Sequence, residues 1–418
     1  MPQRNHLIDL ARVGSMLIVV IFHTLLWQIL FVDGQIQIVP WAPGPVWWAI
    51  SWICTIIPVF FVAAGYSNAV VVDTWRATSD AYAGFLTLRG TKLLGPLTLF
   101  VLVFTTIGSL AAWLGWPEQA AALSRQFAQL LWFLVTYLLL LAAAPLAVWV
   151  HDHWGGWIML PLLAGVIAVD VAVRLTGNLE LQWVNLLFAW PLAHQWGIAY
   201  HRGWFRGWRV SPLLGLLTAG AALIAVLVIG FGYPAAAVAW ADIPVANLLP
   251  PTLVIVVLGW CQTVVLALLE KAGTADRLRE RTARGVRLAN ALLLSVYLWH
   301  IPVIVMVGGI LAGLTLLWPA GSAVLLNPLL LVILVLAAVT GIVPLIARVE
   351  VRLIPTPGPG SPSTPLTLIG FAAFVVGIWA VWQFGAVLAP IDPAGATAVM
   401  TYLVGAGLLW RATTRTSG

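Results

Sequence analysis

Long apolar runs separated by short polar segments make up most of the chain. Runs of about 20 residues, the length that crosses a bilayer, lie near 13–32, 46–68, 92–114, 127–150, 156–173, 181–200, 211–231, 248–269, 288–313, 322–347, 366–388 and 395–410. None shows the alternation of barrel strands, and lipid does not tolerate unpaired backbone groups, so each run is expected to be a helix. The pattern predicts an all-α fold, a polytopic transmembrane helical bundle with twelve spans.

A segment rich in proline and glycine interrupts this pattern near its end. The sequence IPTPGPGSPSTPL at 354–366 cannot continue a helix and indicates a linker. We therefore expect a ten-helix transmembrane core over 1–350, a linker over 351–366, and an appended pair of C-terminal helices with a short tail over 367–418.

Composition and charge narrow the class of protein. Hydrophobic residues make up 62% of the chain and charged residues 8%, against roughly 25% charged residues in soluble proteins, which excludes a soluble enzyme. The two cysteines, Cys54 and Cys261, lie in apolar runs, so neither a disulfide framework nor a cysteine metal cluster is expected.

The basic residues predict the orientation in the membrane. If the N-terminus is cytoplasmic and the spans alternate, every Lys and Arg except Arg125 and Arg174 falls on the inner side. We expect a multi-pass protein of the cell (plasma) membrane with both termini cytoplasmic. The net charge of +6 then reflects this orientation and not a nucleic-acid partner.

The first apolar run carries the strongest candidate for chemistry. Arg12 and His23 are eleven residues apart, which places them on one helix face, separated by roughly 16 Å along the axis, with His23 near mid-membrane. An ionisable side chain at that depth is costly and indicates a functional site. A neutral histidine hydrogen-bonded between helices would explain His23 alone equally well.

Two other motifs place polar side chains at helix spacing. Arg89 and Lys92 are three residues apart at the inner entrance of a run and suit a phosphate-bearing ligand, although charge alone favours topology anchors. Tyr297 and His300 are three apart, ahead of Pro302, and an interfacial Trp and His would explain that motif adequately.

Several other polar residues lie within or near the apolar runs. His194, next to Gln195 in the run at 181–200, either lines the same cavity or packs as a satisfied interhelical histidine. Asp170 and Glu350 lie near run ends and could simply face water.

The triplet His151, Asp152 and His153 has the composition of a metal-ligand set. It has no further ligands at a suitable spacing, so solvated loop residues are favoured and no metal is predicted.

Taken together, five segments resemble the acyltransferase 3 family of integral membrane acyltransferases. They are the Asp-x-x-Arg of Asp9 and Arg12 followed by His23, PVFFVAAGYSN at 58–68, the basic pair before Gly95 and Pro96, LWFLVTYLLL at 131–140, and SVYLWHIP at 295–302. Each is short and mostly apolar, but all occur in the family's order and spacing over about 1–350.

This resemblance implies transfer of an acyl group, usually acetyl from acetyl-CoA, to a hydroxyl of a carbohydrate or glycolipid-type acceptor, as in polysaccharide O-acetylation of the cell envelope. It implies that His23 is the catalytic histidine and that Arg12, Arg89 and Lys92 handle acyl-CoA on the cytoplasmic side. The family usually has an arginine where this chain has Lys92, which offers a point charge in place of a bidentate fork.

The remaining roles stay open in the sequence. Acyl transfer needs an oxyanion stabiliser, and Ser67, Asn68, Tyr297 and Trp299 could each donate to it. We expect Tyr297, His300, His194 and Ser67 to bind substrate together with the three basic residues. The alternative function is a secondary transporter or a lipid-linked substrate flippase without acyl transfer, although no internal repeat supports a transporter.

Overall fold

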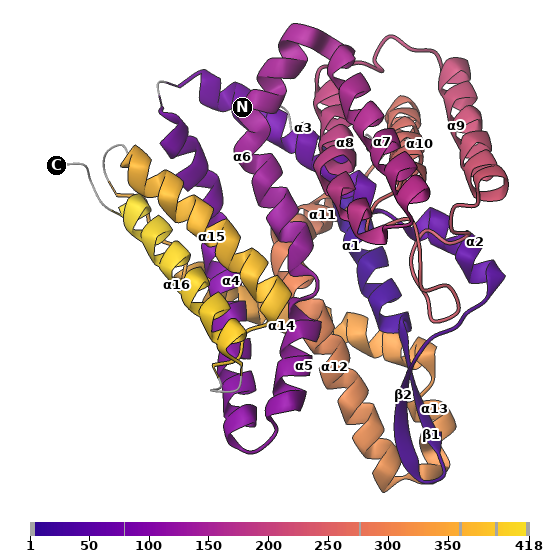
Figure 1. Ribbon diagram of the computed structural model, residues 1–418, viewed down its shortest axis with the longest axis vertical. Helices are drawn as coiled ribbons and strands as arrows, with labels where there is room; N and C mark the ends of the chain where they lie inside the picture. Colours follow the sequence, from indigo (N-terminus) through magenta and orange to yellow (C-terminus); the bar gives the residue numbers. More distant parts are fainter. Residues whose placement is uncertain (1–4, 79, 276, 359–361, 389–391, 415–418) are drawn as a thin grey trace. The chain divides into compact units, whose positions relative to one another are not determined.

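The computed structural model describes residues 5–78, 80–275, 277–358, 362–388 and 392–414. Figure 1 shows that they are almost entirely helical, which confirms the predicted all-α fold. The main elements in chain order are α1 (His6–Leu25), β1 (Trp27–Val32), β2 (Gln35–Pro40), α2 (Pro45–Cys54), α3 (Ile57–Arg76), α4 (Tyr82–Trp113), α5 (Pro117–Ala128), α6 (Leu131–Trp154), α7 (Met159–Thr176), α8 (Leu186–His201), α9 (Val210–Ala225), α10 (Leu253–Lys271), α11 (Glu280–Ala291), α12 (Leu293–Leu317), α13 (Ser322–Leu325), α14 (Pro328–Arg352), α15 (Thr364–Phe384) and α16 (Pro393–Thr414).

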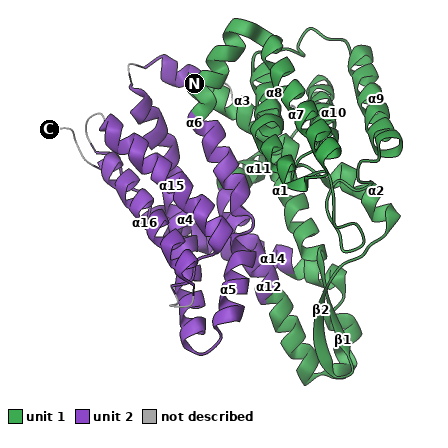
Figure 2. Cartoon of the chain, in the orientation of Figure 1, with its two compact units in different colours: residues 1–72, 143–291, 307–334 green, residues 73–142, 292–306, 335–418 purple. Residues whose placement is uncertain are grey.

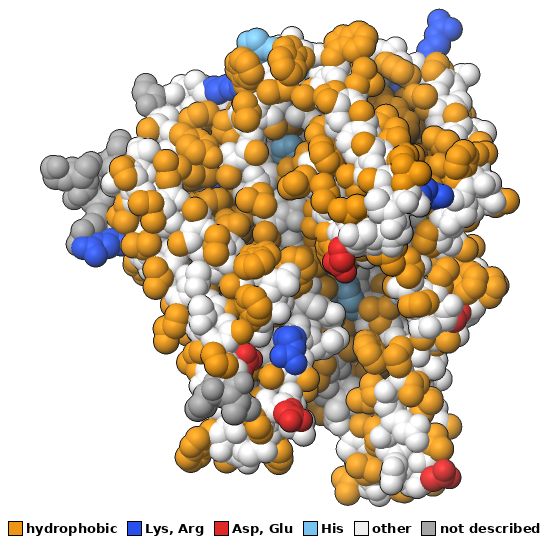
Figure 3. All heavy atoms as spheres, in the orientation of Figure 1, with side chains coloured by type: hydrophobic (Ala, Val, Ile, Leu, Met, Phe, Trp, Pro, Cys, Tyr) orange, Lys and Arg blue, Asp and Glu red, His pale blue; other side chains and the backbone are white. Residues whose placement is uncertain are grey.

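Ten helical stretches among the described residues are long and apolar enough to cross a membrane. This is fewer than the twelve predicted runs, for two reasons. Leu131–Thr176 forms one stretch because a 3₁₀ turn at Gly155–Ile158 joins α6 to α7. The run at 181–200 yields only the 16-residue α8, whose length of about 24 Å is short of the roughly 30 Å bilayer core. Figure 3 shows hydrophobic side chains over much of the visible face, as a polytopic membrane protein requires.

The first run ends earlier than the sequence predicts. Asn5 caps α1 by accepting hydrogen bonds from the backbone N–H groups of Leu7 and Ile8, and the helix then stops at Leu25. The apolar residues that follow form a β-hairpin. Its turn residues, Asp33 and Gly34, both have positive φ, the conformation that matches the twist of paired strands.

The second run, 46–68, divides into two helices. α2 ends at Cys54 and α3 begins at Ile57, with Thr55 extended between them. Pro58 is the second residue of α3, where its missing N–H costs no hydrogen bond within the helix. Hydropathy alone could not place this break.

The described residues form two compact units, and each is assembled from three stretches of chain (Figure 2). Unit 1 comprises Met1–Val72, Ala143–Ala291 and Val307–Leu334, and unit 2 comprises Asp73–Ala142, Leu292–Met306 and Val335–Gly418.

Unit 1 is built around a close approach of α3 and α8. A methyl group on Gly65 would lie 2.0 Å from the backbone oxygen of His194, and one on Gly197 would lie 1.9 Å from that of Val62. Only glycine permits this backbone contact, which is a common way for membrane helices to pack without a hydrophobic driving force.

Unit 2 uses the same device along α4 and in the C-terminal helices. A methyl group on Gly95 would lie 2.3 Å from the backbone oxygen of Glu350 in α14, and Gly377 in α15 packs directly on Tyr402 in α16. The predicted division into core, linker and appended pair stays a sequence prediction. Residues 359–361 of the linker and 415–418 of the tail lie outside the described residues.

Candidate functional site

α1 carries both Arg12 and His23, and both side chains are half-buried. His23 lies in the last turn of the helix, because α1 ends at Leu25. It is therefore nearer a helix end than the predicted mid-membrane position. Its Nδ1 lies 2.9 Å from the backbone oxygen of Val19, so Nδ1 is the nitrogen that donates and carries the proton in the neutral ring. Nε2 is then the basic nitrogen, as a general base requires.

His194 and Ser67 lie where α3 meets α8. His194 is 1% exposed, and its Nε2 accepts a hydrogen bond of 3.1 Å from Asn68 Nδ2. Asn68 is itself fully buried, and its Oδ1 has no partner among the described residues. Ser67 is half-buried beside it. This geometry joins two helices through a polar pair, as expected of an interhelical histidine.

In unit 2, α4 carries Arg89 and Lys92. The Arg89 side chain is half-buried and the Lys92 side chain is exposed. Neither forms an ion pair or a side-chain hydrogen bond with any described residue, and Arg12 in unit 1 is the same in this respect. Cationic groups without a protein carboxylate can bind the phosphates of a ligand.

Tyr297 and His300 lie on α12, also in unit 2. The Tyr297 hydroxyl donates to the backbone oxygen of Leu130. His300 is fully buried, and its Nδ1 lies 2.7 Å from the backbone oxygen of Tyr297 and 3.1 Å from that of Val296. His300 thus has the same tautomer as His23, with Nε2 as the basic nitrogen.

Glu350, which by its position near a run end could have faced water, is buried. It is 2% exposed in α14 and accepts hydrogen bonds from Ser295 Oγ and, at 2.9 Å, from Trp299 Nε1. Ser295 and Trp299 are four residues apart, so the carboxylate holds one face of α12 and fixes the helix that carries His300. The sequence offered one indication of this buried carboxylate, namely that Glu350 lies within five residues of an apolar run.

Asp170 could likewise have faced water, but it is 4% exposed. It accepts hydrogen bonds from Gln182 Nε2 at 2.6 Å, Asn185 Nδ2 at 2.8 Å, the Tyr233 hydroxyl at 2.6 Å and the Leu253 backbone N–H at 2.9 Å. Burial, together with the hydrogen bond to Asp170, raises the pKa of the Tyr233 hydroxyl. The network ties the loop between α9 and α10 to α7.

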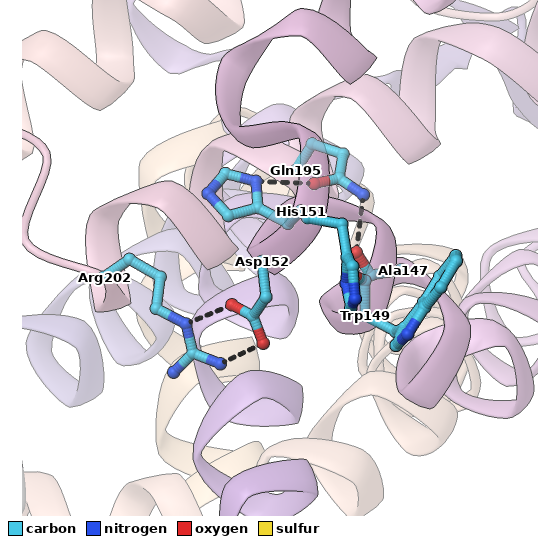
Figure 4. Close-up of polar contacts among 7 residues, drawn as sticks. Ala147, Trp149, His151, Asp152, Gln195 and Arg202 are labelled. Atoms are coloured by element: carbon cyan, nitrogen blue, oxygen red, sulfur yellow. Dashed lines mark hydrogen bonds and ion pairs between the residues drawn. The ribbon is translucent and has the colours of Figure 1, made fainter.

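The triplet at 151–153 lies at the end of α6 and not in a loop (Figure 4). His151 is buried and donates from Nδ1 to Gln195 Oε1 at 3.0 Å, while Asp152 forms a bidentate ion pair with Arg202 at 2.8 and 3.1 Å. No group of three or more His, Cys, Asp or Glu residues in the described part of the chain could hold a metal ion. These side chains join α6 to α8.

The predicted site residues divide between the two units. Unit 1 contains Ser67 and His194 and carries Arg12 and His23 on one helix, whereas unit 2 contains Arg89, Lys92, Tyr297 and His300. His23 in unit 1 and His300 in unit 2 each have their Nδ1 held by a carbonyl of their own helix.

Comparison with known proteins identifies one family. A family model described as an acyltransferase domain, that of the acyltransferase 3 family, matches residues 5–348. None of the curated proteins and none of the solved structures matches the chain. The matched range runs from the residue before α1 to Arg348 within α14, and it includes all the predicted site residues.

Proposed function

The chain belongs to the acyltransferase 3 family, and we propose that it is a membrane O-acyltransferase with His23 as its general base. The donor is acyl-CoA, in the simplest case acetyl-CoA, which reaches the site from the cytoplasmic side. The acceptor is a hydroxyl of a carbohydrate or of a glycolipid.

One observation supports His23 as a base, and it applies to His300 as well. His23 Nδ1 is engaged by the Val19 carbonyl, which leaves the lone pair of the neutral ring on Nε2. The acceptor oxygen attacks the thioester carbonyl while Nε2 takes the hydroxyl proton. The tetrahedral intermediate then breaks its C–S bond, and the imidazolium returns that proton to the CoA thiolate. The products are an ester and free CoA, with His23 neutral again.

Three basic side chains support the proposal that acyl-CoA is the donor. Arg12, Arg89 and Lys92 make no ion pair with the described residues, so their charges are available to the phosphates of CoA. On α1 the base lies about 16 Å beyond Arg12. A donor whose phosphates lie at Arg12 must therefore extend its thioester along the helix to reach His23.

The test is acyl transfer by the purified protein in nanodiscs, followed as free CoA released from acetyl-CoA with no gradient applied. His23→Ala should lower the rate by a factor of about 100 to 10,000 while the protein level stays normal. His153→Ala is the matched control, because that histidine is exposed. Activity above half of wild type in His23→Ala, with loss in His300→Ala, would assign the base to His300 instead. No consumption of acetyl-CoA under any condition would favour a transporter.

A further inference from the structure

A cavity of about 240 Å³ lies at the end of α1, within unit 1. Its walls come from the last residues of α1, from β1, from Trp41, from Leu311 in α12, and from the corner between α13 and α14 up to Leu331. This volume is below the roughly 300–1,000 Å³ of sites that enclose a whole small molecule. The cavity can therefore hold only part of a larger ligand.

Most of the side chains that line the cavity are hydrocarbon. Its side-chain polar groups besides the indoles are Thr24, whose hydroxyl already donates to the Val20 carbonyl, and the amide of Gln28. A sugar ring placed here would leave most of its hydroxyls unpaired, and each unpaired hydroxyl is unfavourable in an apolar environment. An alkyl or isoprenoid chain has no such groups and gains from burial.

The cavity begins one residue from the proposed base. Thr24 in its wall follows His23 directly, and Trp27, the first residue of β1, comes three residues later. Arg12, proposed to bind the donor, lies about 16 Å away toward the start of the same helix. The cavity is thus at the end of α1 opposite the donor's cation, where an acceptor has to approach.

The hairpin whose first strand lines the cavity exposes several apolar side chains, together with polar residues near its turn. Trp27 is 44% exposed and Ile38 is 64% exposed, and Leu30 and Val32 are exposed as well. The hairpin lies close against α12, because a methyl group on Gly308 would be 3.0 Å from Ile29 Cδ1. An exposed apolar hairpin at the ends of membrane helices fits the boundary between lipid and water. A hydrocarbon chain can pass from the lipid into the cavity along this surface.

We propose that this cavity binds the hydrocarbon part of a lipid-borne acceptor, so that the hydroxyl of its headgroup reaches His23. The inference rests on the proposed function and narrows the acceptor from carbohydrates in general to glycolipids.

Binding can be tested without catalysis. The full-length protein in phosphatidylcholine nanodiscs is irradiated with dodecyl β-glucoside that carries a diazirine in its alkyl chain, and the labelled residues are mapped by mass spectrometry. We expect label on β1 or on 325–331, displaced by unlabelled dodecyl β-glucoside and not by methyl β-glucoside. Leu331→Trp should reduce this label at least about tenfold by filling the cavity. Ile333→Trp is the matched control, since Ile333 lies on the same helix but is 62% exposed and outside the cavity.

Several results would overturn the inference. One is label that neither Leu331→Trp nor the more peripheral Leu326→Trp reduces. Another is that unlabelled dodecyl β-glucoside and methyl β-glucoside reduce the label equally. This comparison needs only the wild-type protein, so it holds even if the variants do not fold. A third is equal labelling by a diazirine phosphatidylcholine, because the cavity would then hold bulk lipid.

A transfer assay separates this inference from the proposed function. With acetyl-CoA as donor, Leu331→Trp should lower kcat/KM for dodecyl β-glucoside about tenfold relative to methyl β-glucoside. If both glucosides are acylated equally in all variants, the cavity assignment is wrong and the acyltransferase stands. If the cavity is labelled as expected but no CoA is released with any acceptor, the proposed function is wrong.

Discussion

Replacing Asp170 by leucine should be among the most damaging single changes in unit 1. Leucine is similar in size but cannot accept any of the four hydrogen bonds that end on this carboxylate. Gln182 and Asn185 would each keep a second acceptor, the Pro251 carbonyl, at 3.0 Å. The Tyr233 hydroxyl and the Leu253 N–H would lose the carboxylate as their acceptor.

The size of the effect follows from these two groups. A buried donor left without an acceptor destabilises by about 1–3 kcal/mol, so two of them should lower the free energy of unfolding by about 4 kcal/mol. Tyr233→Phe removes one donor and leaves Asp170 with three, which should lower it by only about 1 kcal/mol. Asp170→Asn keeps one acceptor oxygen and should fall between the two.

The measurement is reversible unfolding in mixed micelles titrated with SDS. Glu180→Gln is the control, because Glu180 is exposed and its neutralisation should change the free energy of unfolding by less than about 0.5 kcal/mol. If Asp170→Leu unfolds at the same SDS fraction as wild type, the carboxylate does not hold the loop. If Tyr233→Phe is as damaging as Asp170→Leu, the stabilisation comes from the tyrosine and not from the carboxylate.

The loop held by Asp170 also reaches the candidate site. Its Trp240 packs against Phe22 at a ring separation of 5.4 Å and against Trp41 at 5.6 Å. Phe22 precedes the proposed base, and Trp41 lines the cavity. Asp170→Leu that still folds should therefore raise the KM for the acceptor more than the KM for acyl-CoA.

Three other predictions concern the donor site, α12 and the topology. If the cations on α4 bind CoA phosphates, Lys92→Gln and Arg89→Gln should each raise the KM for acyl-CoA, while Lys92→Arg should change it little. An unchanged KM in both Gln variants would mean that Arg89 and Lys92 are topology anchors. Glu350→Ala should destabilise the protein by about 2–4 kcal/mol in the same SDS titration, because Trp299 Nε1 and a serine hydroxyl lose their buried acceptor, and Val349→Ala on the exposed face is its control. A reporter fused at residue 280 should be active only in the cytoplasm, and extracytoplasmic activity there would reverse the proposed orientation.

The helical class could be predicted because hydropathy is a property of each run taken alone. The boundaries could not, because they depend on single residues within apolar sequence. The hairpin after Leu25 is as hydrophobic as a helix, and only the Asp33–Gly34 pair signals its turn. Pro58 likewise divides a run whose average hydropathy is unchanged by one proline.

The sequence proposes candidate site residues but does not reveal the contacts that support them. The tautomer of His23 follows from helix geometry, since a side chain four residues on lies over the preceding turn. By contrast, Asp170 collects donors from 182, 185, 233 and 253, positions that no local spacing connects. Buried carboxylates need several donors, so their partners can be found only once the helices are packed.

The early end of α1 determines how far the donor and the acceptor each have to move in the proposed reaction. α1 is 20 residues long, or about 30 Å, comparable with the hydrocarbon thickness of a bilayer. His23 lies two residues from its end, so in the proposed orientation a bilayer that α1 just spans would have the proposed base near its far surface. A headgroup hydroxyl then has little distance to travel, while the thioester has to cover about 16 Å from Arg12. The acyl group therefore makes most of the crossing, and the acceptor can remain anchored by its hydrocarbon in the cavity beside Thr24.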